Sequence, residues 1–359
     1  MENASAKNIN YNSFDLAKLI CAVLVVMIHV DPFGEQVNTN IFSYLNFGLG
    51  NYLCRIAVPM FFVFSGFLLY RKTPLDKFSL KPSKKYLLNI LKLYLLWSLI
   101  YFPLNLIGIL QNPNGIVFAL ALYARNFIFK GSYLHLWYLT ALLFAVALIS
   151  FLLYIKLSAK KVLCISSVCY LIGLLGDAYY GLISPLLDVP VLGQLINIYF
   201  TLIGTVRNGL FFAFFFVALG MFLSQNEIPI GRKKSLLLSA ASIFMLGIEV
   251  FCLKYFNIAK NFNILLFTVP TALFGFTYLR NLKLKDGNIY ATMRKFSSLI
   301  FYGHMWVSVA VSKFANALGF DIKATPIPFI ITLTVTILIA AIVIKISEKK
   351  AFVWLKIFY

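Results

Sequence analysis

The sequence is short of charged residues, and above all of acidic ones. Charged residues make up 12% of the 359 residues, against roughly 25% in an average soluble domain, and only 12 residues are Asp or Glu. Hydrophobic residues reach 61%, so too little polar surface remains to solvate a chain of this size. These shortages exclude a soluble enzyme and a disordered chain, and they favour a protein embedded in a membrane.

Cysteine and histidine are also scarce. The five cysteines are scattered without metal-ligand spacing, so neither a disulfide scaffold nor a metal centre is predicted. The three histidines belong to three different apolar segments and likewise predict no metal site. The excess of 32 basic over 12 acidic residues would suggest nucleic acid in a soluble protein. In a membrane protein Lys and Arg collect in cytoplasmic loops, so no nucleic-acid partner is expected.

Long apolar runs predict an all-α, polytopic transmembrane helical bundle of about ten spanning helices. We expect spans over 14–31, 52–70, 86–110, 134–155, 161–176, 195–223, 235–256, 262–280, 296–317 and 326–346. With both termini cytoplasmic, 22 of the 32 Lys and Arg fall on the inner side and 7 on the outer side. This predicts a single transmembrane domain over 1–359, with cytoplasmic tails at 1–13 and 347–359. The stretch 195–223 is interrupted by Arg207 and Asn208, which predicts a tilted or broken helix.

The first predicted helix carries ionisable residues, which are costly inside a bilayer. Asp15, Lys18 and His29 fall within it, and Asp31 follows directly. Lys18 and His29 are eleven positions apart, so they share one helix face and lie about 16 Å apart along the axis. Asp15 can pair with Lys18 across one turn. Snorkelling of these side chains to the two interfaces is the alternative to a polar groove along the helix.

Four segments of the sequence, in order, carry a recognisable pattern. The first runs from Phe14-Asp15-Leu16-Ala17-Lys18 to His29, and the second is the Ser65-Gly66 segment within 58–69. The others are His135-Leu136-Trp137-Tyr138-Leu139 and Phe301-Tyr302-Gly303-His304. Together they resemble the acyltransferase 3 family of integral membrane acyltransferases, whose first helix carries Arg or Lys, ten residues and then His. Lys18 stands where Arg is commonest in the family, and Lys cannot make the planar two-pronged contact of Arg.

The resemblance implies an enzyme that transfers an acyl group, most often acetyl from acetyl-CoA, to a hydroxyl. The acceptor would be a cell-envelope glycan or a lipid-linked sugar beyond a bacterial cell membrane. The expected partners are therefore membrane lipid, acyl-CoA and a saccharide, and no permanently bound cofactor is expected.

The same resemblance and the chemistry of the side chains assign roles to particular residues. His29 would act as base or as acyl carrier. Lys18 would assist His29 and, with Arg71, would bind the donor phosphates. Asp31 would orient His29, provided that the helix ends before it. The predicted acceptor-binding residues are Arg55, His135, Trp137 and Tyr138, and the predicted groove-lining residues are Asp15, Ser65 and His304.

Structural alternatives stay open for several of these residues. His135, Trp137 and Tyr138 could form an aromatic belt at the interface, and Arg55 could be an anchor there. Ser65 and its neighbouring glycine could be a helix-packing point. Arg207 and Glu249 lie in apolar segments without an evident partner.

Two other functions compete with acyl transfer. A transporter or flippase would use the polar groove as a solute or proton path, but the sequence shows one interrupted helix and no matching second one. The membrane domains of vancomycin-resistance type serine racemases also resemble this pattern, and they are followed by a soluble racemase domain. Because this chain ends at Tyr359 without one, we expect a stand-alone transferase.

Overall fold

A computed structural model describes residues 11–33, 41–73, 75, 78–322 and 325–359 of the chain. Within these residues every regular element is a helix, which confirms the predicted all-α class. Six helical segments are long and apolar enough to cross a membrane, and a pair of helices bent by 84° would make a seventh. The chain is therefore a helical membrane protein.

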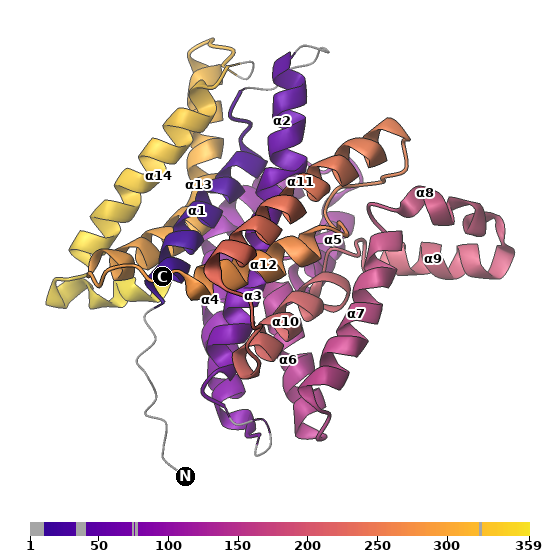
Figure 1. Cartoon of the computed structure of the whole chain (residues 1–359). Coiled ribbons are helices and arrows are strands. Elements are labelled where there is room, and N and C mark those ends of the chain that lie inside the picture. The colour runs from indigo at the N-terminus through magenta and orange to yellow at the C-terminus, as the bar shows by residue number, and fades with distance from the viewer. Residues whose placement is uncertain (1–10, 34–40, 74, 76–77, 323–324) are drawn as a thin grey trace.

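The helices follow one another through mostly short connections (Figure 1). They are α1 (Asn12–His29), α2 (Ile41–Asn51), η1 (Leu53–Ile56), α3 (Ala57–Tyr70), α4 (Leu80–Leu110), α5 (Ile116–Phe129), α6 (Trp137–Tyr154), α7 (Ala159–Leu175), α8 (Tyr180–Ile183), η2 (Ser184–Asp188), α9 (Pro190–Leu202), η3 (Gly209–Ala213), α10 (Phe214–Gln225), α11 (Arg232–Tyr255), α12 (Thr268–Asn281), α13 (Ile289–Ala317), α14 (Ile327–Ile346) and η4 (Lys350–Phe358).

The stretch expected to be tilted or broken is broken. Helix α9 ends at Leu202, and the chain becomes helical again only in the π-helical turn η3, which continues into α10. The side chain of Asn208 accepts hydrogen bonds from the backbone amides of Leu210 and Phe211, so it caps the new helix. This break holds Arg207 in a non-helical segment just before η3.

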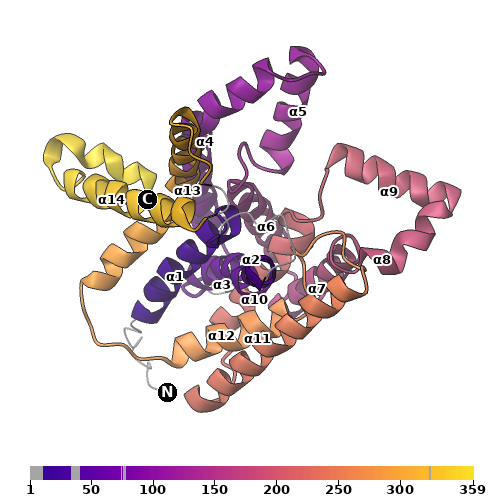
Figure 2. The same cartoon turned by 90° about the horizontal axis from the view of Figure 1, so that it is seen from above.

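The core of the bundle is built from five helices. Helix α1 packs against α13 and α3, while α10 packs against α3 and α6. Seen from above, α1, α3, α6 and α10 occupy the middle, and the pairs α4–α5, α8–α9 and α11–α12 lie around them (Figure 2). Because α1 is surrounded by other helices, its polar residues face protein rather than lipid.

Helices α3 and α10 approach each other closely at two glycines. A Cβ atom on Gly66 would collide with the carbonyl oxygen of Val217, and one on Gly220 would collide with that of Val63. Only glycine allows the two backbones to lie this close. Gly66, the residue after Ser65, is therefore a helix-packing point.

Substitution of Gly220 by alanine is expected to destabilise the protein. The collision is with backbone, which cannot swing aside as a side chain can, so the loss should be about 2 kcal/mol or more. Gly108→Ala is the matched control, because Gly108 is also in a helix and a Cβ atom there would meet nothing within 4 Å. Denaturation of the purified protein in mixed micelles measures both variants. Equal stabilities of the two would contradict the close packing.

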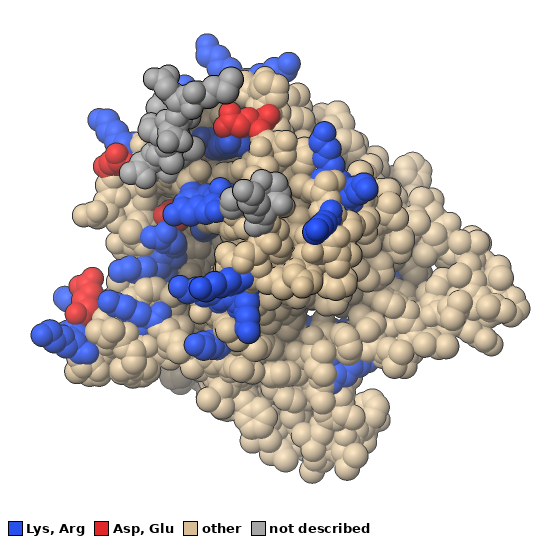
Figure 3. All heavy atoms as spheres, turned by 90° about the horizontal axis from the view of Figure 1, so that it is seen from below, with Lys and Arg blue, Asp and Glu red and all other residues tan. Residues whose placement is uncertain are grey.

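Basic residues gather on one end of the bundle. Figure 3 views the protein from below and shows Lys and Arg side chains concentrated on that face, with few acidic ones among them. The connections from α3 to α4 and from α6 to α7 lie at this lower end in Figure 1. This lower end is therefore a basic face of the protein.

Candidate active site

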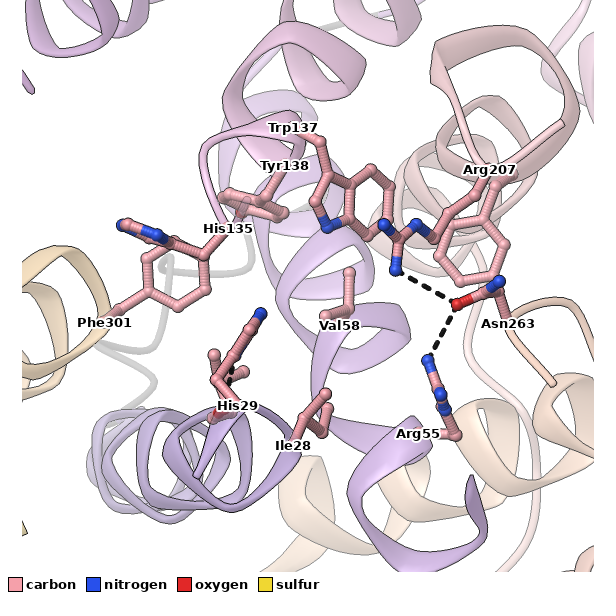
Figure 4. A pocket seen from close by; sticks show the side chains of 12 residues that line it. Ile28, His29, Arg55, Val58, His135, Trp137, Tyr138, Arg207, Asn263 and Phe301 are labelled. Carbon is pink, nitrogen blue, oxygen red and sulfur yellow. Dashed lines mark hydrogen bonds between the residues drawn. The ribbon is translucent and has the colours of Figure 1, made fainter. Parts of the chain in front are cut away.

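Two cavities lie along α1, one near each end of its polar face. The outer cavity is at the His29 end and measures about 40 Å³. The inner cavity is at the Lys18 end and measures about 220 Å³. The outer cavity (Figure 4) is lined by Val25, Ile28, His29, Arg55, Val58, His135, Trp137, Tyr138, Arg207, Phe212, Asn263 and Phe301. The inner cavity is lined by Lys18, Phe61, Ser65, Tyr138, Arg294, Ser297, Ser298, Phe301 and Tyr302.

Two aromatic side chains line both cavities. Tyr138 at the start of α6 and Phe301 on α13 have ring centroids 5.4 Å apart. The hydroxyl of Tyr138 lies 3.1 Å from that of Ser65, whose own proton is donated to the Phe61 carbonyl 2.8 Å away. Tyr138 and Phe301 thus form the partition between the two cavities, and Ser65 fixes the tyrosine.

All three histidines of the chain meet beside the outer cavity. Their rings come from the last turn of α1, from the residues just before α6, and from the middle of α13. The ring centroid of His304 lies 5.2 Å from that of His29 and 5.0 Å from that of His135, while His29 and His135 are 6.4 Å apart. His304 therefore stands between the other two.

A backbone carbonyl fixes the proton on one nitrogen of each ring. Nδ1 of His29 lies 2.8 Å from the Val25 carbonyl oxygen, and Nδ1 of His304 lies 2.9 Å from that of Phe301. Nε2 of His135 lies 3.2 Å from the Tyr302 carbonyl oxygen. A carbonyl can only accept a hydrogen bond, so in each neutral imidazole that nitrogen carries the hydrogen.

The second nitrogen of each ring is left as a base. In the described part of the chain, Nδ1 of His135 and Nε2 of His304 are buried without a hydrogen-bond partner. Figure 4 shows the His29 ring pointing into the outer cavity. The described part of the cluster thus presents lone pairs that can take up the proton of a hydroxyl-bearing substrate.

The inner cavity is charged. Nζ of Lys18 and a guanidinium nitrogen of Arg294 each lie 3.8 Å from a carboxylate oxygen of Asp15. The Arg294 side chain is 59% exposed, so it is open to solvent, whereas those of Lys18 and Asp15 are 17% and 14% exposed. Two positive charges against one negative charge make this cavity suitable for an anion.

Most predicted site residues lie at one of the two cavities. His29, Arg55, His135, Trp137 and Tyr138 line the outer one.

Lys18 and Ser65 line the inner cavity, and Asp15 pairs with Lys18 there. His304 lies beside His29, with 5.2 Å between the ring centroids. His135 is 1% exposed, so it is buried in the protein rather than part of an interfacial belt.

Arg71 and Asp31 are not among the lining residues of either cavity. Arg71 stacks its guanidinium on the ring of Tyr11, with 4.4 Å between the guanidinium carbon and the ring centroid, and it is not among the inner cavity's lining residues. Asp31 follows the end of α1 at His29, as its predicted role requires, but the Val25 carbonyl already holds Nδ1 of His29. The roles of Arg71 and Asp31 stay predictions.

Sequence reasoning gave no site role to Arg207, Asn263 and Arg294, three of the polar lining residues. Arg294 had a signal, because Arg294, Ser297, Ser298 and Phe301 recur at helical spacing and all face the inner cavity. Asn263 had none, because it lies in a loop. Nη1 of Arg55 and Nη1 of Arg207 donate to its side-chain oxygen across 2.8 and 3.0 Å (Figure 4).

Two buried carboxylates hold that loop in place. Asp177 accepts hydrogen bonds from the backbone amides of Asn263 and Ile264, and also from the Asn263 side chain. Glu249 accepts from the Tyr179 hydroxyl and from the backbone amides of Leu266 and Phe267, just before α12 begins. The partners that Arg207 and Glu249 lacked in the sequence are therefore loop residues around 263–267.

The protein is thus a helical membrane protein with a histidine cluster beside an outer cavity and a second, charged cavity at the inner end of α1. Residues 11–346 match the profile of the acyltransferase 3 family, described as an acyltransferase domain, and the chain belongs to this family. The match covers nearly the whole chain. No solved structure matches it.

The curated relatives are named racemases rather than acyltransferases. Two amino-acid racemases of Enterococcus faecalis are 29% identical over 346 residues and 30% identical over 268 residues. These matches cover 94% and 74% of this chain but 46% and 35% of the relatives. A serine/alanine racemase of Enterococcus gallinarum is 31% identical over 271 residues, and the match covers 72% of this chain and 36% of the racemase. The chain thus spans less than half the length of the curated relatives it matches.

Proposed function

We propose that the protein moves an acyl group, acetyl first of all, from acyl-CoA to a hydroxyl of an envelope glycan or lipid-linked sugar. The acceptor hydroxyl enters the outer cavity and gives its proton to Nε2 of His29 while its oxygen attacks the thioester carbon. The carbon–sulfur bond breaks, and the thiolate of coenzyme A takes up a proton. The other route has His29 itself carry the acyl group before the hydroxyl takes it.

The observation that carries this proposal is the pairing of two unlike cavities on one helix. The inner cavity is basic and partly open, which suits a polyanionic donor. The outer cavity holds imidazoles fixed as bases, which suits activation of a hydroxyl. Among the described residues, Tyr138 and Phe301 are the two that line both cavities, so an acyl group would reach the histidines by passing between them.

We further propose that the basic face of Figure 3 is the cytoplasmic face of a bacterial cell membrane. Ten spans follow if α1, α3, α4, α6, α7, α10, α11, α12, α13 and α14 all cross. Both termini are then cytoplasmic, and 1–359 is one domain. Helices α5, α8 and α9 would lie beside the bundle. Acyl-CoA, which is made in the cytoplasm, would meet the inner cavity directly.

Transfer of radiolabelled acetyl from acetyl-CoA tests the proposal. The purified protein is reconstituted into vesicles with a crude glycan or lipid-linked sugar fraction, and label in alkali-labile ester is measured. Protein-free vesicles are the control. We expect label to appear with the protein only. Its absence with acetyl-, propionyl- and succinyl-CoA would contradict acyl transfer.

A second candidate function is the movement of a free amino acid across the membrane. The observation in its favour is the naming of the relatives as amino-acid racemases. The part of each relative that matches this chain is less than half of its length, and we propose that this part handles the free amino acid. Uptake of labelled L-serine and L-alanine into the same vesicles tests it. Uptake without any ester formation would favour this candidate over the transferase.

Replacement of Arg294 by glutamine is expected to weaken donor binding. The charge-assisted contacts of Arg294 with a phosphate are worth about 1.5–3 kcal/mol, which corresponds to a rise in KM for acetyl-CoA of roughly 10- to 100-fold. The turnover number should change little, because Arg294 does not line the outer cavity. Arg232→Gln removes an exposed charge at the start of α11 and is the matched control. An unchanged KM would separate Arg294 from the donor.

A further inference from the structure

Two arginines share a single neutral acceptor at the wall of the outer cavity. Arg55, from η1, and Arg207, from the break before η3, both donate to the side-chain oxygen of Asn263. Arg207 also stacks on Trp137, with 4.7 Å between the guanidinium carbon and the ring centroid. Trp137 and Asn263 therefore hold two like charges close together and facing the same small space (Figure 4).

The protein supplies too little negative charge for this pair. Among the described residues neither arginine forms an ion pair within 4 Å with a carboxylate. Asp177 is the carboxylate whose charge acts on both arginines, but its oxygens are engaged by the backbone and side chain of Asn263 and by the Ile264 amide. Two guanidinium groups thus face one carboxylate that is already hydrogen-bonded elsewhere.

One donor atom of the pair is also unused. Nε of Arg55 is buried and has no hydrogen-bond partner in the described part of the chain, although burial of such a donor costs free energy. The excess positive charge also acts on a neighbouring lysine. Partial burial, together with the neighbouring positive charges of Arg125 and Arg207, lowers the pKa of Lys130 on the loop before α6. Both the excess positive charge and the unused buried donor would be satisfied by a bound anion.

The geometry points to Arg55 and Arg207 as one subsite that binds an oxyanion group, carboxylate or phosphate, carried by the acceptor. A guanidinium fork matches the oxygens of such a group. The cavity of about 40 Å³ admits a group of this size. This deepens the proposed function, on which it rests, by making the acceptor anionic next to its reacting hydroxyl.

Binding of small anions to the purified full-length protein tests the subsite without any acyl-CoA. Sodium acetate and sodium phosphate are the probes, acetamide is the uncharged analogue of acetate, and sodium chloride matches the ionic strength. We expect acetate, phosphate or both to raise the Tm saturably by about 2 °C, and acetamide to leave it unchanged. The anion with the lower half-saturating concentration identifies a carboxylate or a phosphate as the group bound.

Variants separate the subsite from a merely structural role. In Arg207→Gln the anion-dependent rise should disappear, while the Tm without anion should stay level or increase, because one of two repelling charges is gone. A structural role predicts the opposite, a lower Tm at every anion concentration. Arg232→Gln, at the start of α11, is the matched control and should keep the rise.

Three outcomes would overturn the inference. The first is a rise with acetamide equal to that with acetate, and the second is no rise with either anion. The third is a rise that Arg207→Gln retains and Arg294→Gln removes, since the anion would then bind in the inner cavity. Because the readout is stability, a failed transfer assay and a failed anion assay are distinguishable results.

Discussion

Replacement of His29 by alanine is expected to lower acyl transfer by about 10²–10⁴-fold, the usual contribution of a general base. The variant removes the imidazole at the end of α1, which points into the outer cavity. Donor binding should persist, because the inner cavity is lined by other residues. Initial rates of ester formation, with acetyl-CoA binding measured separately, give both quantities.

A control for His29 must come from outside the cluster, because all three histidines of the chain belong to it. Thr332→Val is suitable, since the Thr332 hydroxyl is buried in α14 without a hydrogen-bond partner among the described residues. This nearly isosteric change should leave transfer unaltered. A His29→Ala variant that keeps more than about a tenth of the wild-type rate would exclude His29 as the base.

His304→Ala tests whether the cluster works as a unit. His304 lies between His29 and His135, and its free nitrogen has no partner, so it can share the proton that His29 takes up. If so, the double variant with His29→Ala should be no slower than His29→Ala alone, since residues that act together are strongly non-additive. If the double variant instead lost the product of the two single-variant losses in rate, the two histidines would act independently.

The sequence predicted the polar face of α1 because that pattern is local. Asp15, Lys18 and His29 lie in one helix, and helical geometry alone places them on one side. The convergence of His135 and His304 on His29 could not be predicted in this way, because the three residues are far apart in the sequence. Their order in the family pattern indicated that they matter, and only the packing of α1, α6 and α13 brings them together.

The arginine subsite depends on long-range hydrogen bonds that no sequence period reveals. Asn263 faces the cavity because Asp177, distant in the sequence, holds the backbone of its loop. Arg207 faces it because the helix breaks before η3, and the sequence did suggest that break. The same chain therefore shows an intrahelical pattern that could be predicted and a loop placement that could not.

Replacement of Phe301 by leucine is expected to uncouple the two cavities. Phe301 and Tyr138 form the partition, and a smaller side chain leaves room for water to reach the thioester from the other side. A barrier lowered by about 1.4 kcal/mol would raise hydrolysis of acetyl-CoA without acceptor about tenfold. Release of coenzyme A from acceptor-free vesicles measures this reaction, in which water replaces the acceptor hydroxyl.

Phe276→Leu is the matched control for the partition. Phe276 is fully buried in α12 among Phe14, Phe64 and Phe67, and it lines neither cavity. Both variants lose a similar buried ring, so both should lose similar stability. Only Phe301→Leu should hydrolyse the donor faster. If Phe276→Leu does so equally, loosened packing is the cause, and if neither does, the acyl group reaches His29 by another path than the one between Tyr138 and Phe301.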